Sequence, residues 1–113
     1  MRCLAFYRFS KIKGVSLPNR QALIRKLASC NPNEIALCFI REPNNNFDPN
    51  AIQIAAIINH DNPIHIGYVD KSLAANISPM LDSGKESIVI LECFTGLHYT
   101  NSNIGINYKY VII

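Results

Sequence analysis

Hydrophobic and polar residues alternate along several short stretches of the chain, with the period of two that is typical of β-strands. The clearest case is the last segment, where Ile106, Tyr108 and Tyr110 stand at every second position. Residues 34–41 form an almost uninterrupted apolar run of strand length, as expected for a strand that is covered on both faces. We therefore expect five or six strands, drawn from residues 2–15, 34–41, 51–58, 64–69, 87–95 and 104–113.

Two further segments have apolar residues at helical spacing. In residues 18–28 the leucines stand four positions apart. In residues 71–81 the apolar side chains fall on one side of the expected helix, and Asp70, just before it, is a suitable N-cap. Pro79 lies inside the second segment and is expected to split it into two short pieces, because proline lacks the N–H that a helix interior needs. The sequence therefore predicts two short helices.

Short strands with two helices inserted between them indicate a mainly β protein of the α+β type. On a chain of 113 residues, a small OB-like or SH3-like β-barrel of five to six strands is the expected architecture, since closing the sheet removes exposed strand edges. The length suits one domain over residues 1–113, because two cores would each be too small to bury enough surface.

Composition narrows the class of protein. The chain is 49% hydrophobic with a net charge of +3, which excludes a disordered segment. No apolar run reaches the roughly 18 residues that a membrane span needs, so we expect a soluble, cytoplasmic protein with no membrane partner. The cysteines (Cys3, Cys30, Cys38 and Cys93) include no C-x-x-C pair, and are expected to be buried apolar residues rather than metal ligands.

Charge is distributed unevenly along the chain. Residues 1–33 contain seven basic residues and no acidic one, whereas the remainder contains four basic and eight acidic residues. The seven are Arg2, Arg8, Lys11, Lys13, Arg20, Arg25 and Lys26. A fold that gathered them on one face would attract phosphates, although solvated strand and helix faces explain the same pattern equally well.

The most distinctive stretch is residues 41–52, which read REPNNNFDPNAI, followed by residues 66–74, which read IGYVDKSLA. The order and spacing of these two motifs resemble the HIRAN domain family, in its standalone bacterial or phage form. The resemblance extends over almost the whole chain, including the glycine and arginine of residues 14–20 and the Thr-Gly and Ile-Gly-Ile segments near the C-terminus.

The resemblance implies a small β-barrel related to OB folds that binds single-stranded DNA and prefers the free 3′-hydroxyl end. It implies a role in DNA repair or replication-fork processing, beside a separately encoded helicase or nuclease. The resemblance implies that Asp48 recognises the 3′ end of the strand, because a carboxylate accepts a hydrogen bond from a hydroxyl and repels a phosphate. Phe47 is expected to stack on a base. Asn45, Tyr68 and Lys71 are expected to add polar, aromatic and phosphate contacts.

One feature departs from the family pattern. Relatives that bind DNA ends carry an arginine followed by aromatic residues after the first-strand glycine, whereas residues 14–18 here read GVSLP. A basic residue nearby would have to replace the missing phosphate contact, and the candidates are Arg8, Lys11, Lys13 and Arg20. Tyr99 is the candidate for a second aromatic platform.

Turn chemistry offers a structural explanation for the same motif. Asp-Pro-Asn is an ordinary turn sequence in which Asp48 would bond its own backbone. In that interpretation Phe47 plugs the end of the barrel and Glu42 pairs with Arg41.

Two other classes of function compete with DNA binding. The chain has no nucleophile elbow, phosphate-binding loop or paired ligand motif, so no enzyme, cofactor or metal site is expected. The alternative to DNA binding is a protein-interaction or oligomerisation module, in which the strand over residues 104–113 pairs edge to edge with another copy.

Overall fold

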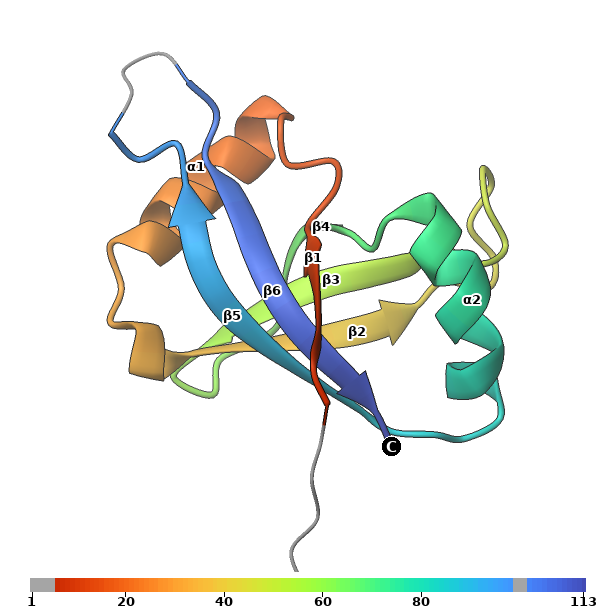
Figure 1. The fold of residues 1–113 in the computed structure, drawn as a ribbon. Coiled ribbons are helices and arrows are strands. Elements are labelled where there is room, and N and C mark those ends of the chain that lie inside the picture. Colours follow the sequence, from red (N-terminus) through yellow and green to blue (C-terminus); the bar gives the residue numbers. More distant parts are fainter. Residues whose placement is uncertain (1–5, 99–101) are drawn as a thin grey trace, which may run out of the picture.

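The computed structural model describes residues 6–98 and 102–113 and confirms a mainly β architecture with two α-helices (Figure 1). Its elements, in chain order, are β1 (Arg8–Lys11), α1 (Pro18–Ala28), the 3-10 turn η1 (Pro32–Glu34), β2 (Ile35–Arg41), β3 (Ile52–Ile58), β4 (Ile64–Tyr68), α2 (Lys71–Asp82), β5 (Ser87–Thr95) and β6 (Gly105–Ile112).

The strands form one antiparallel sheet in the order β1-β6-β5-β2-β3-β4. The sheet curls into a partly closed barrel, as the crossing ribbons show (Figure 1). Its two edges meet at one point, where the backbones of Lys13 and Tyr68 exchange hydrogen bonds of 2.8 and 2.9 Å. Gly67 permits this approach, because a Cβ there would lie 2.5 Å from the Lys13 carbonyl oxygen. The expected OB-like fold is therefore confirmed.

The core lies on the concave side of the sheet. Tyr108 is fully buried and meets the ring of Phe39 edge-on, with 6.0 Å between centroids. The alternation predicted for the last strand is confirmed, since Ile106, Tyr108 and Tyr110 are all buried. Helix α1 contributes Ile24 and Leu27 to the core, and helix α2 contributes Ala74 and Ile77.

A buried glutamine ties helix α1 to the start of β6. The Gln21 amide nitrogen donates to the carbonyl oxygens of Val15 and Ile104, and its oxygen accepts from the Ile104 N–H. All of these bonds are between 2.8 and 2.9 Å. A buried amide is stable only when it is bonded in this way, so Gln21 fixes the position of α1 against the sheet.

Some sequence predictions differ from the structure. The first strand is shorter than expected, because β1 spans Arg8–Lys11 and residues 2–5 lie outside the described residues. Pro79 does not split helix α2, which continues to Asp82. Pro79 and Ala75, whose carbonyl loses its usual donor, are both exposed, so water can replace the missing bond. Cys93 is exposed rather than buried, and Cys30 and Cys38 are half-buried.

The strand that the alternative hypothesis assigned to edge pairing is not a sheet edge. β6 lies between β1 and β5 and pairs with both. The residues that the structure describes include no helix long and apolar enough to cross a membrane.

Candidate nucleic-acid interface

The fold brings all five predicted site residues to one groove of about 750 Å³. The loop between β2 and β3 supplies Asn45, Phe47 and Asp48, the end of β4 supplies Tyr68, and the first residue of α2 is Lys71. Basic residues from elsewhere also line it, namely Lys13, after β1, and Arg20, in the first turn of α1.

Asn45 organises the loop that carries Phe47 and Asp48. Its side-chain oxygen accepts hydrogen bonds from the backbone N–H groups of Phe47 at 2.9 Å and Asp48 at 3.0 Å. Its amide nitrogen donates to Glu42 Oε1 at 3.0 Å. These bonds use the oxygen and one of the two amide hydrogens that were expected to contact DNA, so in this structure Asn45 holds the loop in shape.

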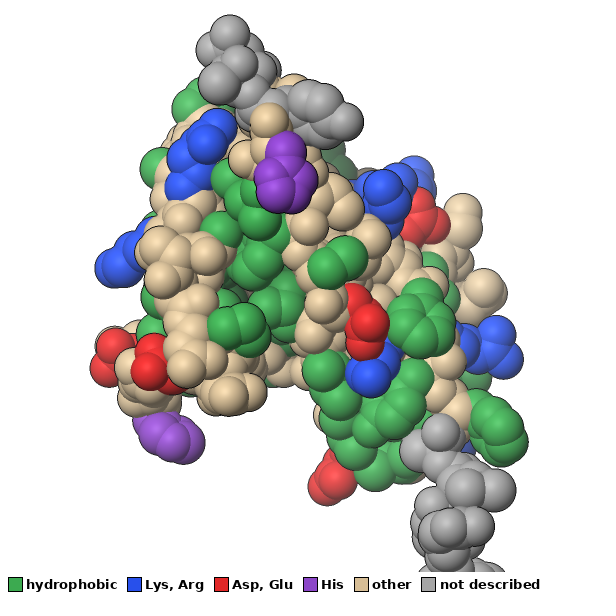
Figure 2. Space-filling view, turned by 60° about the vertical axis from the view of Figure 1, so that its left-hand side comes forward, with side chains coloured by type: hydrophobic (Ala, Val, Ile, Leu, Met, Phe, Trp, Pro, Cys, Tyr) green, Lys and Arg blue, Asp and Glu red, His purple; other side chains and the backbone are tan. Residues whose placement is uncertain are grey.

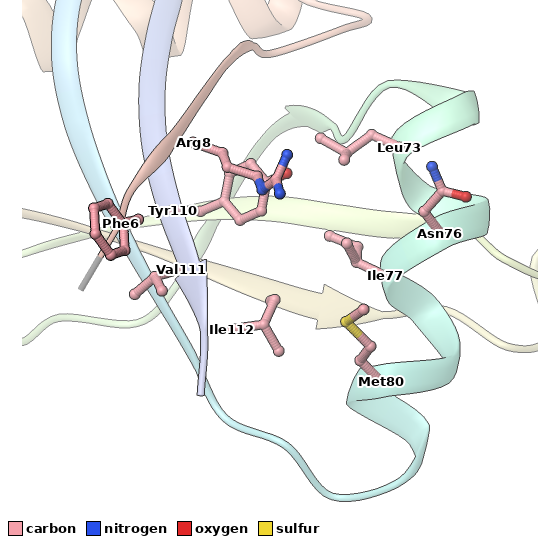
Figure 3. Close-up of a pocket in the computed structure, with 9 residues that line it drawn as sticks. All are labelled: Phe6, Arg8, Leu73, Asn76, Ile77, Met80, Tyr110, Val111 and Ile112. Carbon is pink, nitrogen blue, oxygen red and sulfur yellow. The ribbon is translucent and has the colours of Figure 1, made fainter. Parts of the chain in front are cut away.

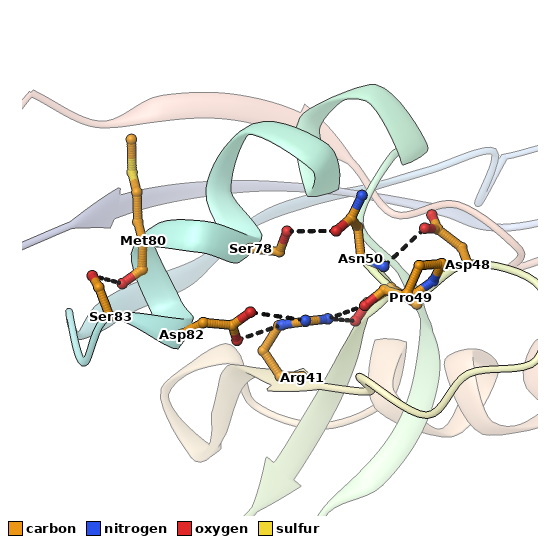
Figure 4. A network of polar contacts seen from close by, with 9 residues as sticks. Arg41, Asp48, Pro49, Asn50, Ser78, Met80, Asp82 and Ser83 are labelled. Atoms are coloured by element: carbon orange, nitrogen blue, oxygen red, sulfur yellow. Dashed lines mark hydrogen bonds and ion pairs between the residues drawn. The ribbon is translucent and has the colours of Figure 1, made fainter.

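Phe47 and Asp48 differ in their exposure and in the hydrogen bonds that their side chains make within the loop. The Phe47 ring is 95% exposed, so the interpretation that it plugs the barrel is wrong. Asp48 Oδ1 accepts from the Asn50 backbone N–H at 2.9 Å (Figure 4), as the turn interpretation expected. The structure assigns Oδ2 no hydrogen bond within the described residues. Asp48 therefore shapes its own bend and also lines the groove.

Arg41 fixes the far side of the same bend (Figure 4). Its guanidinium makes two bonds of 2.8 and 3.0 Å to the Asp82 carboxylate at the end of α2. A third nitrogen donates to the carbonyl oxygens of Pro49 and Ala51. The expected pairing of Arg41 with Glu42 is therefore wrong, because the Arg41 side chain lies against α2 and the loop.

Glu42 instead accepts hydrogen bonds from three side chains on separate elements. Asn45 and the Tyr68 hydroxyl donate to Oε1 at 3.0 and 2.8 Å, and Gln53 donates to Oε2 at 2.7 Å. Desolvation raises the pKa of Glu42, but these three bonds outweigh it and hold the pKa below its usual value. The carboxylate thus stays charged and ties the loop to β3 and β4.

Arg20 lies against the Tyr68 ring, with its guanidinium carbon 5.5 Å from the ring centroid. The guanidinium donates to the Gly14 carbonyl at 2.8 Å and lies 2.7 Å from His65 Nε2. Because arginine only donates, His65 Nε2 must be the unprotonated acceptor. Burial, assisted by the Arg20 charge, lowers the pKa of His65. Arg20 thus places a positive charge beside Gly14 and Tyr68 in the groove.

The start of helix α2 forms the opposite wall of the groove. Asp70 caps the helix as predicted, accepting from the backbone N–H groups of Ser72 and Leu73 at 3.2 and 3.4 Å. These N–H groups are therefore occupied by the cap and are not offered to a phosphate. Lys13 Nζ lies 4.0 Å from Asp70 Oδ1, which partly neutralises that acid. Lys71 is exposed beside them.

The other basic residues of the N-terminal third are not gathered here. Arg8 lines a separate cavity, Lys11 lies beside β5 and β6, and Arg25 and Lys26 are on helix α1. Figure 2 shows lysine and arginine side chains standing apart on the face in view. Arg2 and Tyr99 lie outside the described residues.

The sequence motif identified the loop but not the residues that hold it in place. The roles of Glu42 and Arg41 depend on Gln53, Tyr68 and Asp82, which lie 11 to 41 positions away. The only signal was that both residues belong to the REPNN segment. Within the described residues, no group of three or more His, Cys, Asp or Glu side chains is placed to hold a metal ion.

Comparison with known proteins gives one match. The family model described as HIRAN domain matches residues 19–107. No curated protein and no solved structure matches the chain. The matched range contains both motifs and every groove residue named above except Lys13 and Gly14.

Proposed function

The chain belongs to the HIRAN domain family, and from that premise we propose that it binds single-stranded DNA and recognises the free 3′-hydroxyl end, without catalysing a reaction. The observation that supports this most directly is the pair Phe47 and Asp48 at the rim of the groove. A large ring that is 95% exposed contributes little to folding, and its position suits stacking on a base.

Asp48 would distinguish a strand end from its interior. Its Oδ1 is held by the Asn50 N–H, which fixes the orientation of the carboxylate and directs the other oxygen to the ligand. That oxygen can accept the hydrogen of a terminal hydroxyl. A phosphate at the same place would meet a like charge, which costs about 1–4 kcal/mol at roughly 4 Å between the values for water and for a protein surface.

Phosphates of the bound strand would be contacted by the three basic residues of the groove, Lys13, Arg20 and Lys71. Arg20 is held by Gly14 and His65, so it loses little side-chain entropy when it binds a ligand. Three phosphate contacts on single-stranded DNA predict a modest salt dependence, with a log–log slope of about −2.

A module that recognises a 3′ end without catalysing a reaction would work beside an enzyme that acts on that end. We therefore propose a role in DNA repair or replication-fork processing, beside a helicase or nuclease. Support for this assignment comes from the family alone.

The test is a fluorescence titration with two labelled oligonucleotides that differ only in a 3′-hydroxyl or a 3′-phosphate. The protein should bind the hydroxyl form at least tenfold more tightly. Asp48→Asn keeps an oxygen for the Asn50 N–H but removes the charge, so it should bind the 3′-phosphate form better than the wild type does. Equal affinity of the wild-type protein for both oligonucleotides would refute end recognition.

Phe47→Ala tests the stacking role separately. It should weaken binding to both oligonucleotides by about 5- to 150-fold, which corresponds to about 1–3 kcal/mol per stacked base. Phe9→Ala is the matched control, because Phe9 is also exposed, at 69%, and does not line the groove. If the two variants bind DNA alike, Phe47 is not a stacking platform.

A further inference from the structure

Within residues 6–98 and 102–113, one side of the β1 backbone has no strand partner over two residues. In an antiparallel pair, alternate residues bond the neighbouring strand and the residues between them face away. The Ile12 N–H donates to the Ile106 carbonyl of β6 at 3.0 Å. By the register of this pair, Phe9 and Lys11 direct their N–H and C=O groups away from β6. The next residue on that side, Lys13, is paired with β4, so the unpaired edge of β1 comprises Phe9 and Lys11.

A cavity of about 410 Å³ opens beside this edge, between helix α2 and the strands β1 and β6 (Figure 3). Its apolar and aromatic lining comprises Phe6, Leu73, Ile77, Met80, Tyr110, Val111 and Ile112. Arg8 and Asn76 are the polar residues of the lining. The volume is within the range of ligand pockets, and the cavity shares no lining residue with the DNA groove.

The charge at the cavity is positive. Arg8 pairs in register with Tyr110, so both side chains lie on the same face of the sheet, and Figure 3 shows the guanidinium beside the Tyr110 ring and directed toward α2. Within the described part of the chain, Arg8 makes no ion pair with a carboxylate. Lys11 lies on the other face of the sheet, so the charge that the cavity offers to an acidic ligand is that of Arg8.

We propose that an extended segment of a partner protein, with an aliphatic and an acidic residue two positions apart, adds as a strand to the free edge of β1. Peptides commonly bind by this mode, with affinity from main-chain bonds and specificity from pockets for alternate side chains. Residues two apart face the same side of a strand. The aliphatic side chain enters the cavity between Ile77 and Met80, and the carboxylate pairs with Arg8.

The lining favours a protein segment over nucleic acid. Surfaces for single-stranded DNA combine a basic groove with successive aromatic platforms, whereas five of the nine lining residues here are aliphatic or methionine. Met80 at 43% and Phe6 at 81% exposure leave apolar surface that an aliphatic side chain would cover. This inference does not depend on the proposed DNA binding.

The test uses a labelled ten-residue peptide with leucine and aspartate two positions apart in a threonine background. Binding should protect the backbone N–H groups of Phe9 and Lys11 from hydrogen exchange and leave that of Ser10, already paired with β6, unchanged. The control is the same peptide N-methylated at the positions that would face β1, which should not bind. Arg8→Glu should weaken binding about tenfold, and lysine in place of the peptide's aspartate should restore it.

Three outcomes would overturn the proposal. The peptide and its N-methylated form could bind alike, which would exclude strand addition. An oligonucleotide without the peptide could protect Phe9 and Lys11, which would assign the edge to DNA. Protection that depends on protein concentration without peptide would show that a second copy of the chain occupies the edge.

Discussion

Glu42→Gln is the substitution that most directly tests how the structure holds the loop that carries Phe47 and Asp48. The Glu42 carboxylate accepts hydrogen bonds from Asn45, Gln53 and Tyr68 at 2.7 to 3.0 Å. Glutamine has the same shape but only one accepting oxygen. Its amide nitrogen would face a donor, either the Gln53 amide or the pair formed by Asn45 and Tyr68.

The expected loss of stability and of DNA affinity follows from this mismatch of donors and acceptors. Hydrogen bonds to a charged acceptor contribute about 1.5–3 kcal/mol each, and leaving one partner unsatisfied costs about 1–3 kcal/mol. Since Glu42 is only half-buried, we expect about 2 kcal/mol, which lowers the melting temperature of a chain of this size by about 8 °C. Because Asn45 would no longer be held, the loop would also have to be ordered on binding, and DNA affinity should fall about tenfold.

The assays are thermal unfolding and the fluorescence titration, with Glu92→Gln as the control. Glu92 makes one ion pair, to Lys109 at 3.1 Å on the surface of the sheet, where the loss should be below about 1 kcal/mol. The pKa of Glu42 is lowered in the folded protein, so its contribution is present at neutral pH and disappears as the pH falls through that pKa. The difference between wild type and Glu42→Gln should therefore shrink in acid. If Glu42→Gln matched Glu92→Gln in stability and DNA affinity, the loop would not depend on Glu42.

Burial raises the pKa of Tyr108 to about 12, so this residue should lower wild-type stability by about 3 kcal/mol between pH 10 and 12 as the unfolded chain ionises. Because burial also raises the pKa of Tyr68 and of Tyr110, chemical denaturation of Tyr108→Phe should show a smaller fall rather than none, and an equal fall in both proteins would contradict this prediction. Gly67→Ala should separate Lys13 from β4 and cost about 1–3 kcal/mol, and unchanged unfolding would refute the closure described for the sheet. Arg41→Lys should destabilise more than Asp82→Asn, because lysine cannot reproduce the paired bonds to Asp82 and also loses the arrangement that bonds Pro49 and Ala51. The double variant should be no worse than Arg41→Lys alone, and additive losses would contradict this coupling.

The candidate site was only partly predictable from the sequence. The motif identified the segment, and the fold does bring Asn45, Phe47, Asp48, Tyr68 and Lys71 to one groove. Their separate roles were not predictable, because a loop residue can serve the turn or a ligand, and only the hydrogen-bond partners distinguish the two. Asn45 makes its side-chain hydrogen bonds within the loop. The ring of Phe47 is instead exposed.

The sequence by itself determined the strands and helices, because the spacing of apolar residues follows from the geometry of each element. It determined the inward face of β6 for the same reason. It determined the cap of α2 because the short Asp70 side chain accepts hydrogen bonds from the N–H groups two and three residues later. Only the tertiary structure decided which strands became edges, how Lys13 meets Tyr68, and which charges pair. These outcomes depend on contacts between residues far apart in the chain, and the local pattern of a segment carries no information about the segment that will lie beside it.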